Sequence, residues 1–169
     1  MKTYRAELHS HTVLSPCAEV EMIPPLIVQT VLEKGINLLA VTDHNASANV
    51  IAVQQAARGS GLIVLPGMEL QTREEVHALC LFDTFEQSQQ FQSLVNAHLP
   101  QQQNAPDYFG IQLVVDREGE LIREEKQLLL TSTSLSLVQA WEQVNALGGL
   151  FIPAHINRKA FGLIETLGF

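Results

Sequence analysis

Apolar residues in the first hundred positions alternate between two patterns. Continuous apolar runs of strand length predict strands that are buried on both faces, as parallel strands are. These runs occupy residues 36–42, 62–66 and 75–82, after a shorter strand candidate at residues 4–8. Apolar positions at helical spacing predict helices over residues 24–34, 46–60 and 86–98. This alternation predicts an α/β fold with parallel strands covered by helices.

The alternation stops after residue 100 and resumes near residue 135. Between them, two strand-like arms flank a turn, which predicts a β-hairpin insert near residues 108–123. A helix over residues 136–147 and a strand over residues 149–155 follow. At 169 residues the chain has the length of one domain, so we expect a single domain over residues 1–169.

Charge and composition narrow the function classes. The net charge of −8 and the pI near 5.1 give no support to a broad basic surface, so nucleic acid is predicted to be an unlikely partner. A metal cluster in a cleft would still attract a phosphate locally. No apolar run approaches the roughly 20 residues of a membrane helix, and no signal peptide is recognisable. We therefore expect no membrane association and a cytoplasmic location.

The strongest chemical pattern is a set of histidines and one glutamate near predicted strands. The set comprises His9, His11, His44, Glu69, His77 and His155. Loops at the carboxyl ends of parallel strands converge on one rim, so these side chains are expected to meet there. Imidazole and carboxylate are ligands suited to zinc, manganese or iron. One histidine at a strand end is usually a structural residue, but five in one place predict a metal site.

Four other residues have competing interpretations. Asp43 is the cap of a helix that begins near Ala46, an acceptor that orients an imidazole, or a metal ligand in its own right. Cys17 is either a small buried apolar residue or a soft metal ligand, whereas Cys80 is predicted to lie in the core. The two cysteines form no C-x-x-C pair and give no sign of a disulfide framework. His98 is predicted to be a solvated residue at a helix end.

Four segments together resemble the PHP family, the polymerase and histidinol phosphatase domain. They are ELHSHTVLSPC, AVTDHN, LPGMELQT with EVHALCLF, and IPAHINR, in that order along the chain. The resemblance implies a distorted (β/α)₇ TIM-like barrel with two or three divalent metal ions at its carboxyl-end rim. Members of the family hydrolyse phosphoesters, including histidinol phosphate, nucleotides and nucleic acid ends.

The resemblance also implies roles for individual residues. It assigns metal ligands to His9, His11, His44, Glu69, His77 and His155, with Glu69 bridging two ions. Cys17 stands where many members have a histidine or aspartate ligand, and Asp43 is a supporting residue beside the second motif. Arg158 is similar to a family arginine and would face the substrate phosphate, unless it is a surface charge at a helix start.

One departure concerns the closing part of the barrel. The family pattern includes a late D-x-H motif, and the sequence contains none. We therefore expect a barrel that is incomplete at its C-terminus, and an oligomer contact or second chain that covers the missing strands.

Three functions remain open at this point. The favoured one is a metal-dependent phosphoesterase that hydrolyses a small phosphomonoester or nucleotide with a metal-activated water. His9, His11 and Glu69 would hold the ion that activates the water, and the remaining histidines would hold the ions that clamp the phosphoryl group. The alternatives are a nuclease or polymerase-associated editing module, and a non-catalytic or regulatory metal-binding relic.

Overall fold

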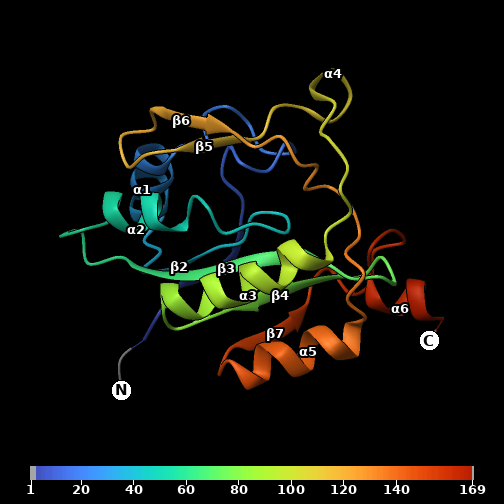
Figure 1. Ribbon diagram of the computed structural model, residues 1–169. Helices are drawn as coiled ribbons and strands as arrows, with labels where there is room; N and C mark the ends of the chain where they lie inside the picture. The colour runs from blue at the N-terminus through green and yellow to red at the C-terminus, as the bar shows by residue number, and fades with distance from the viewer. Residues whose placement is uncertain (1–2, 169) are drawn as a thin grey trace.

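A curled five-stranded sheet forms the centre of the molecule (Figure 1). The computed structural model describes residues 3–168, so the outermost residues of the predicted domain lie outside the described range. The strands are Ala6–Ser10 (β1), Leu38–Val41 (β2), Ile63–Gln71 (β3), His77–Leu81 (β4) and Leu150–Pro153 (β7). They lie side by side in the order β1-β2-β3-β4-β7. This mixed α/β sheet has the form of a half-barrel.

The direction of β4 differs from the prediction. The pairs β1/β2 and β2/β3 are parallel, as predicted, but β4 is antiparallel to both β3 and β7. Residues 72–76 join β3 to β4 in a tight turn that the Thr72–Val76 backbone hydrogen bond closes at 2.9 Å. A parallel connection needs a crossover of a dozen or more residues, so a prediction of uniformly parallel strands is wrong here.

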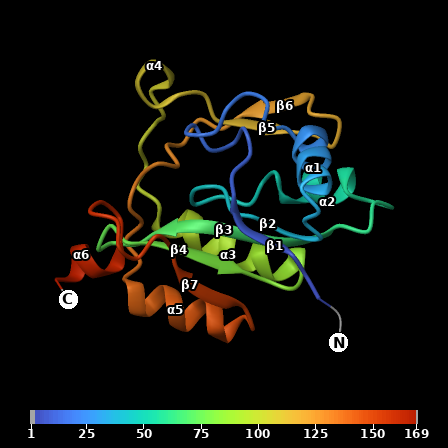
Figure 2. The same cartoon turned by 180° about the vertical axis from the view of Figure 1, so that it is seen from behind.

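Helices cover the sheet on two sides. They are Pro24–Glu33 (α1), Val50–Ala56 (α2), Phe85–His98 (α3), Pro106–Phe109 (α4), Leu137–Ala146 (α5) and Leu163–Leu167 (α6). Figures 1 and 2 show α1 and α2 on the side of the sheet away from α5. One apolar cluster joins α1 and α2 to β2, and a second joins α3 and α5 to β3 and β4.

Local chemistry explains where these helices begin. Pro24 and Pro25 occupy the first positions of α1, where the missing N–H costs nothing. Capping boxes start α3 at Thr84 and α5 at Ser136. Helix α2 is shorter than the predicted range 46–60, because residues 45–49 are held in a polar loop that precedes it.

An antiparallel pair occupies the predicted hairpin. It consists of Leu113–Val115 (β5) and Leu121–Glu124 (β6), and it lies on the same side of the sheet as α1 and α2 (Figure 1). Among the described residues, no helix combines the length and the apolar character needed to cross a membrane.

Candidate metal centre

Five imidazoles surround the carboxylate of Glu69, which is only 1% exposed. Oxygen Oε2 lies 3.1 Å from His9 Nε2, 3.2 Å from His11 Nε2 and 3.3 Å from His44 Nδ1. Oxygen Oε1 lies 3.0 Å from His77 Nδ1 and 3.2 Å from His155 Nε2. The structure thus brings together all six predicted histidine and glutamate residues around one point.

The sheet accounts for this convergence. His9 lies near the carboxyl end of β1, His44 follows β2, and His155 follows β7, so parallel strands deliver three donors to one rim. His77 reaches the same rim for the opposite reason: it is the first residue of β4, whose direction is reversed. Glu69 lies within β3, between these donors, and forms an isolated parallel bridge with His44.

Burial and hydrogen bonding shift the pKa values of Glu69, His44 and His155. Burial alone would raise the pKa of Glu69, but hydrogen bonds from His11, His77 and His9 outweigh burial and hold that pKa well below its usual range. Burial lowers the pKa of His44 to about 3, so this imidazole is neutral near pH 7. Burial also lowers the pKa of His155. A neutral imidazole is the form that binds a metal.

The donor set fits divalent metal ions. Three buried imidazole nitrogens have no hydrogen-bond partner within the described part of the chain: His44 Nδ1, His77 Nε2 and His155 Nδ1. The first of these lies 3.3 Å from Glu69 Oε2 without forming a hydrogen bond to it. Five imidazoles also exceed what two carboxylate oxygens satisfy. Three groups have ligand atoms within 4.8 Å of one another: His9 with His11 and Glu69, His44 with Glu69 and His77, and His11 with Cys17 and His44. Such histidine-rich sets are typical of zinc, manganese or iron sites.

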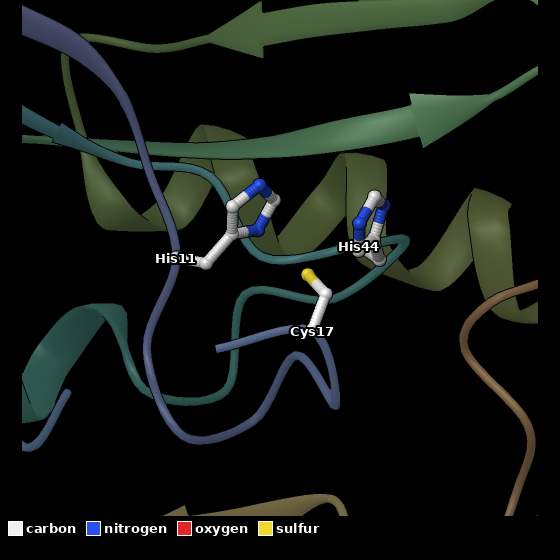
Figure 3. A group of neighbouring side chains, drawn as sticks. All are labelled: His11, Cys17 and His44. Carbon is white, nitrogen blue, oxygen red and sulfur yellow. The ribbon is translucent and has the colours of Figure 1, made fainter. Parts of the chain in front are cut away.

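Cys17 belongs to the third group. Figure 3 shows its sulfur directed toward the space between the imidazoles of His11 and His44. The residue is exposed, so the interpretation of Cys17 as a small buried residue is wrong. Partial burial of the thiol nevertheless raises its pKa. Cys80, in contrast, is fully buried in the core, as predicted.

Asp43 organises the loop that follows β1 and begins with His11. Its carboxylate accepts hydrogen bonds from the Thr12 backbone and hydroxyl, both at 2.7 Å, and from the Ser15 hydroxyl at 2.8 Å. The interpretation of Asp43 as a helix cap is wrong, because α2 begins only at Val50. Asp43 contacts the imidazoles indirectly, through Ser15.

Ser15 determines which nitrogen of His11 carries a proton. Its hydroxyl hydrogen goes to Asp43, so its oxygen accepts from the His44 backbone N–H at 3.0 Å and from His11 Nδ1 at 3.1 Å. Nδ1 of His11 therefore carries a hydrogen, and Nε2, which lies 3.2 Å from Glu69 Oε2 and donates to it, is the nitrogen that a metal ion would bind in place of the Nε2 proton. Ser15 was not among the predicted residues, since a serine in a loop carries no recognisable signal by itself.

A cavity of about 470 Å³ opens onto the donors. Arg158 lines it and is exposed, so contact of Arg158 with a substrate phosphate stays a prediction. Phe109, Leu130 and Phe161 form an apolar part of the same lining. None of these three apolar residues was predicted, because their sequence does not distinguish them from ordinary core residues.

Phe161 contacts the metal centre directly. Its ring is parallel to that of His77, with centroids 4.5 Å apart and an interplanar angle of 14°. The His77 backbone N–H donates to the Phe161 carbonyl at 3.0 Å, and Ala154 donates to the His77 carbonyl at 2.9 Å. The loop after β7 is therefore attached to the first residue of β4.

Comparison with known proteins places these features in a family. The sequence pattern of the PHP domain matches residues 7–148. A 5'-3' exoribonuclease Rnm from Salmonella typhimurium is 33% identical over 75 residues, which cover 43% of this chain and 25% of that protein. Rnm from Escherichia coli is 32% identical over the same length. The match therefore spans about a quarter of these relatives.

Solved structures share the fold. The lesion-specific endonuclease Q of Pyrococcus furiosus superposes with a TM-score of 0.69 at 19% identity, over 96% of this chain and 37% of that chain. A candidate metal-dependent phosphoesterase from Bifidobacterium adolescentis gives a TM-score of 0.60 at 18% identity, over 91% and 68%. An endonuclease Q complex with a 27-mer duplex that carries an abasic lesion gives a TM-score of 0.65 at 18% identity, over 95% and 37%.

These findings overturn the prediction that nucleic acid is an unlikely partner. The similar proteins include nucleases, and one is bound to DNA. The prediction rested on net charge, which sums the whole surface, whereas a metal rim binds phosphate locally. Because the PHP pattern covers most of the chain and the six donors meet at one rim, the chain belongs to the PHP domain family.

Proposed function

We propose that this chain carries the metal-binding rim of a hydrolase that cleaves phosphoester bonds with water as the nucleophile. The observation that supports this most strongly is the set of five imidazoles around the buried Glu69 carboxylate. Divalent ions held there would lower the pKa of bound water and offset the charge that develops on the phosphoryl oxygens. PHP membership and the phosphoesterase and nuclease neighbours agree with this chemistry.

The protein residues have distinct roles in the proposal. Glu69 has one oxygen toward His9 and the other toward His77, and would hold an ion at each oxygen. Ser15, held by Asp43, keeps the His11 ring in the tautomer that donates Nε2 to a metal. Arg158, in the lining of the same cavity, would contact a phosphoryl oxygen.

The substrate is either a nucleic acid or a small phosphomonoester. The similarity to Rnm and endonuclease Q favours a nucleic acid substrate. The cavity of about 470 Å³ also has the size of a small-ligand site, which favours a nucleotide or another small phosphomonoester. Both reactions break a phosphoester bond at the same rim.

The test begins with metal content. Protein stripped with a chelator is reconstituted with zinc, manganese or iron, and bound metal is measured by elemental analysis. Hydrolysis is then followed with 5'-phosphorylated oligonucleotides, a duplex with an abasic site, and small phosphomonoesters. We expect at least one ion per chain and metal-dependent turnover of at least one class.

Glu69→Gln is the decisive variant, with Glu118→Gln as the matched control at an exposed position. The proposal is supported if Glu69→Gln loses both bound metal and turnover while Glu118→Gln keeps both. Bound metal without turnover of any phosphoester would contradict it and favour a regulatory metal-binding protein.

A further inference from the structure

The lining of the cavity beside the metal centre combines two chemically different sets of side chains. The polar set includes the imidazoles, Glu69 and Arg158, and the apolar set consists of Phe109, Leu130 and Phe161. A phosphoryl group needs only the polar set. Sugar hydroxyl groups placed against the apolar set would lose water without gaining partners. The apolar side chains therefore fit a flat, apolar part of the substrate.

Phe161 is held in place with unusual firmness. Its φ of +61° lies in the left-handed region, which an aromatic residue rarely adopts. The hydrogen bond from the His77 backbone and the parallel stacking on the His77 ring fix this conformation. Close packing of the loop adds to the constraint, because a Cβ at Gly162 would lie 2.3 Å from the Arg158 carbonyl oxygen.

The Phe161 ring is nevertheless not covered. It is 38% exposed while it lines the cavity. A strained backbone that presents an exposed aromatic ring beside a reactive centre is typical of a ligand-binding device. The Phe161 ring thus contacts the His77 imidazole and also faces the cavity.

Arg158 lies on the same loop and supplies the complementary charge. It is the one lysine or arginine in the cavity lining. Within residues 3–168 it makes no ion pair of 4.0 Å or less. A cation that lines a cavity next to an aromatic ring, without a protein anion, matches a phosphate attached to an aromatic group.

We propose that the cavity binds a nucleotide unit, with its base against Phe161 and its phosphate between the metal rim and Arg158. This inference rests on the proposed phosphoester hydrolase and assigns the part of the substrate that lies outside the reacting bond. Stacking on an aromatic side chain accepts every base, because each base has a π-face. Phe161 would therefore distinguish nucleotides from other phosphoesters without selecting a base.

The experiment uses 2-aminopurine, a base whose fluorescence is quenched when it stacks. Metal-loaded protein is titrated with an oligonucleotide that carries 2-aminopurine and a phosphate at its 5' end. A second oligonucleotide has an abasic residue at the same position and a dye at its far end, so that its binding is followed by anisotropy. We expect quenching by the wild type, and binding that is roughly 5- to 100-fold tighter for the base-bearing end than for the abasic end.

Phe161→Leu should remove the quenching and the preference for the base, while binding of the abasic oligonucleotide changes less than about 2-fold. Phe161→Tyr, which keeps the ring, should retain both. Trp141→Leu, at an exposed position on α5 outside the cavity lining, serves as the matched control. Equal weakening of both oligonucleotides by Phe161→Leu, or no weakening of either, would overturn the inference.

A free 2-aminopurine nucleotide distinguishes a site for free nucleotides from a site for the 5' end of a nucleic acid strand. Quenching of the free nucleotide as strong as that of the oligonucleotide indicates a nucleotide site, and quenching of the oligonucleotide alone indicates a strand-end site; quenching of neither overturns the inference. Because quenching reports binding of the base and hydrolysis is assayed separately, the two proposals fail separately. Quenching without hydrolysis of any phosphoester contradicts the enzyme, whereas hydrolysis without a Phe161-dependent preference contradicts base stacking.

Discussion

Thr12 uses both oxygens of the Asp43 carboxylate. Its backbone N–H donates to Oδ1 and its hydroxyl donates to Oδ2, each at 2.7 Å, and both residues are fully buried. Asn49 adds a hydrogen bond from its side-chain amide to the Thr12 hydroxyl at 2.9 Å. The loop that follows β1 is therefore fastened to the end of β2, and the first two histidines are fixed relative to His44.

Asp43→Asn tests this attachment. The new amide would present a donor where Thr12 or Ser15 also donates, so one buried donor loses its partner, at about 1–3 kcal/mol. We expect the free energy of unfolding in urea to fall by about that amount. Asp83→Asn, at an exposed position, should change it by less than about 0.5 kcal/mol. Equal losses in the two variants would show that the carboxylate does not hold the loop.

Ser15→Ala removes the acceptor that orients His11. Without it, the imidazole no longer has a fixed tautomer, and loss of such a supporting hydrogen bond typically weakens metal binding by about 10- to 100-fold. Isothermal titration of the stripped protein with zinc measures the effect. Ser93→Ala, on the exposed side of α3, is the matched control and should bind zinc like the wild type. Unchanged zinc affinity in Ser15→Ala would remove Ser15 from the metal centre.

Cys17 is expected to bind metal through its thiolate. Loading with cobalt should then produce the near-ultraviolet charge-transfer absorption of a cobalt–sulfur bond, and Cys17→Ser should abolish that absorption. Cys80→Ala should keep it, because Cys80 is buried in the core. Bound zinc should also slow alkylation of Cys17, which is exposed in the free protein. Cobalt binding without sulfur absorption would exclude Cys17 as a ligand.

Glu74 provides a pH-dependent contribution to stability. Burial opposes its ionisation, but the hydrogen bond from the Leu137 backbone N–H at 2.9 Å and the other hydrogen bonds together outweigh burial and hold the pKa of Glu74 below its ordinary value of 4.5. Because the folded pKa is lower than the unfolded one, this stabilisation is fully present above pH 4.5 and is lost as the pH falls through the folded pKa.

Glu74→Gln should therefore lower the melting temperature near pH 7 slightly and flatten its dependence on pH below 4.5. Thermal melts at several pH values measure both effects. Glu118→Gln, at an exposed position, should leave the acid limb unchanged. If the melting temperature of Glu74→Gln falls as steeply below pH 4.5 as that of the wild type, Glu74 does not provide this stabilisation.

The donors of the metal centre are recognisable in the sequence because their positions follow one rule. Parallel strands that alternate with helices deliver their carboxyl ends to a common rim, and His44 and His155 follow such strands. His77 reached the predicted rim although the direction of its strand was mispredicted. The short turn at residues 72–76 reverses the strand and also exchanges its ends.

The supporting residues were not recognisable because they act across the chain. Asp43 is 31 positions from Thr12, and no local pattern distinguishes this contact from a helix cap. Phe161 depends on a left-handed backbone at a non-glycine residue, which propensity does not favour. Such features arise from tertiary contacts that override local preference.

The distribution of the donors along the chain has a consequence for folding. His155 lies 86 positions after Glu69, and His9 lies 60 positions before it. An ion held by these residues would join distant parts of the chain as a disulfide does, and long closed loops restrict the unfolded ensemble most. The metal centre would then act as a reversible cross-link, and the protein would resist proteolysis and heat according to the metal supply around it.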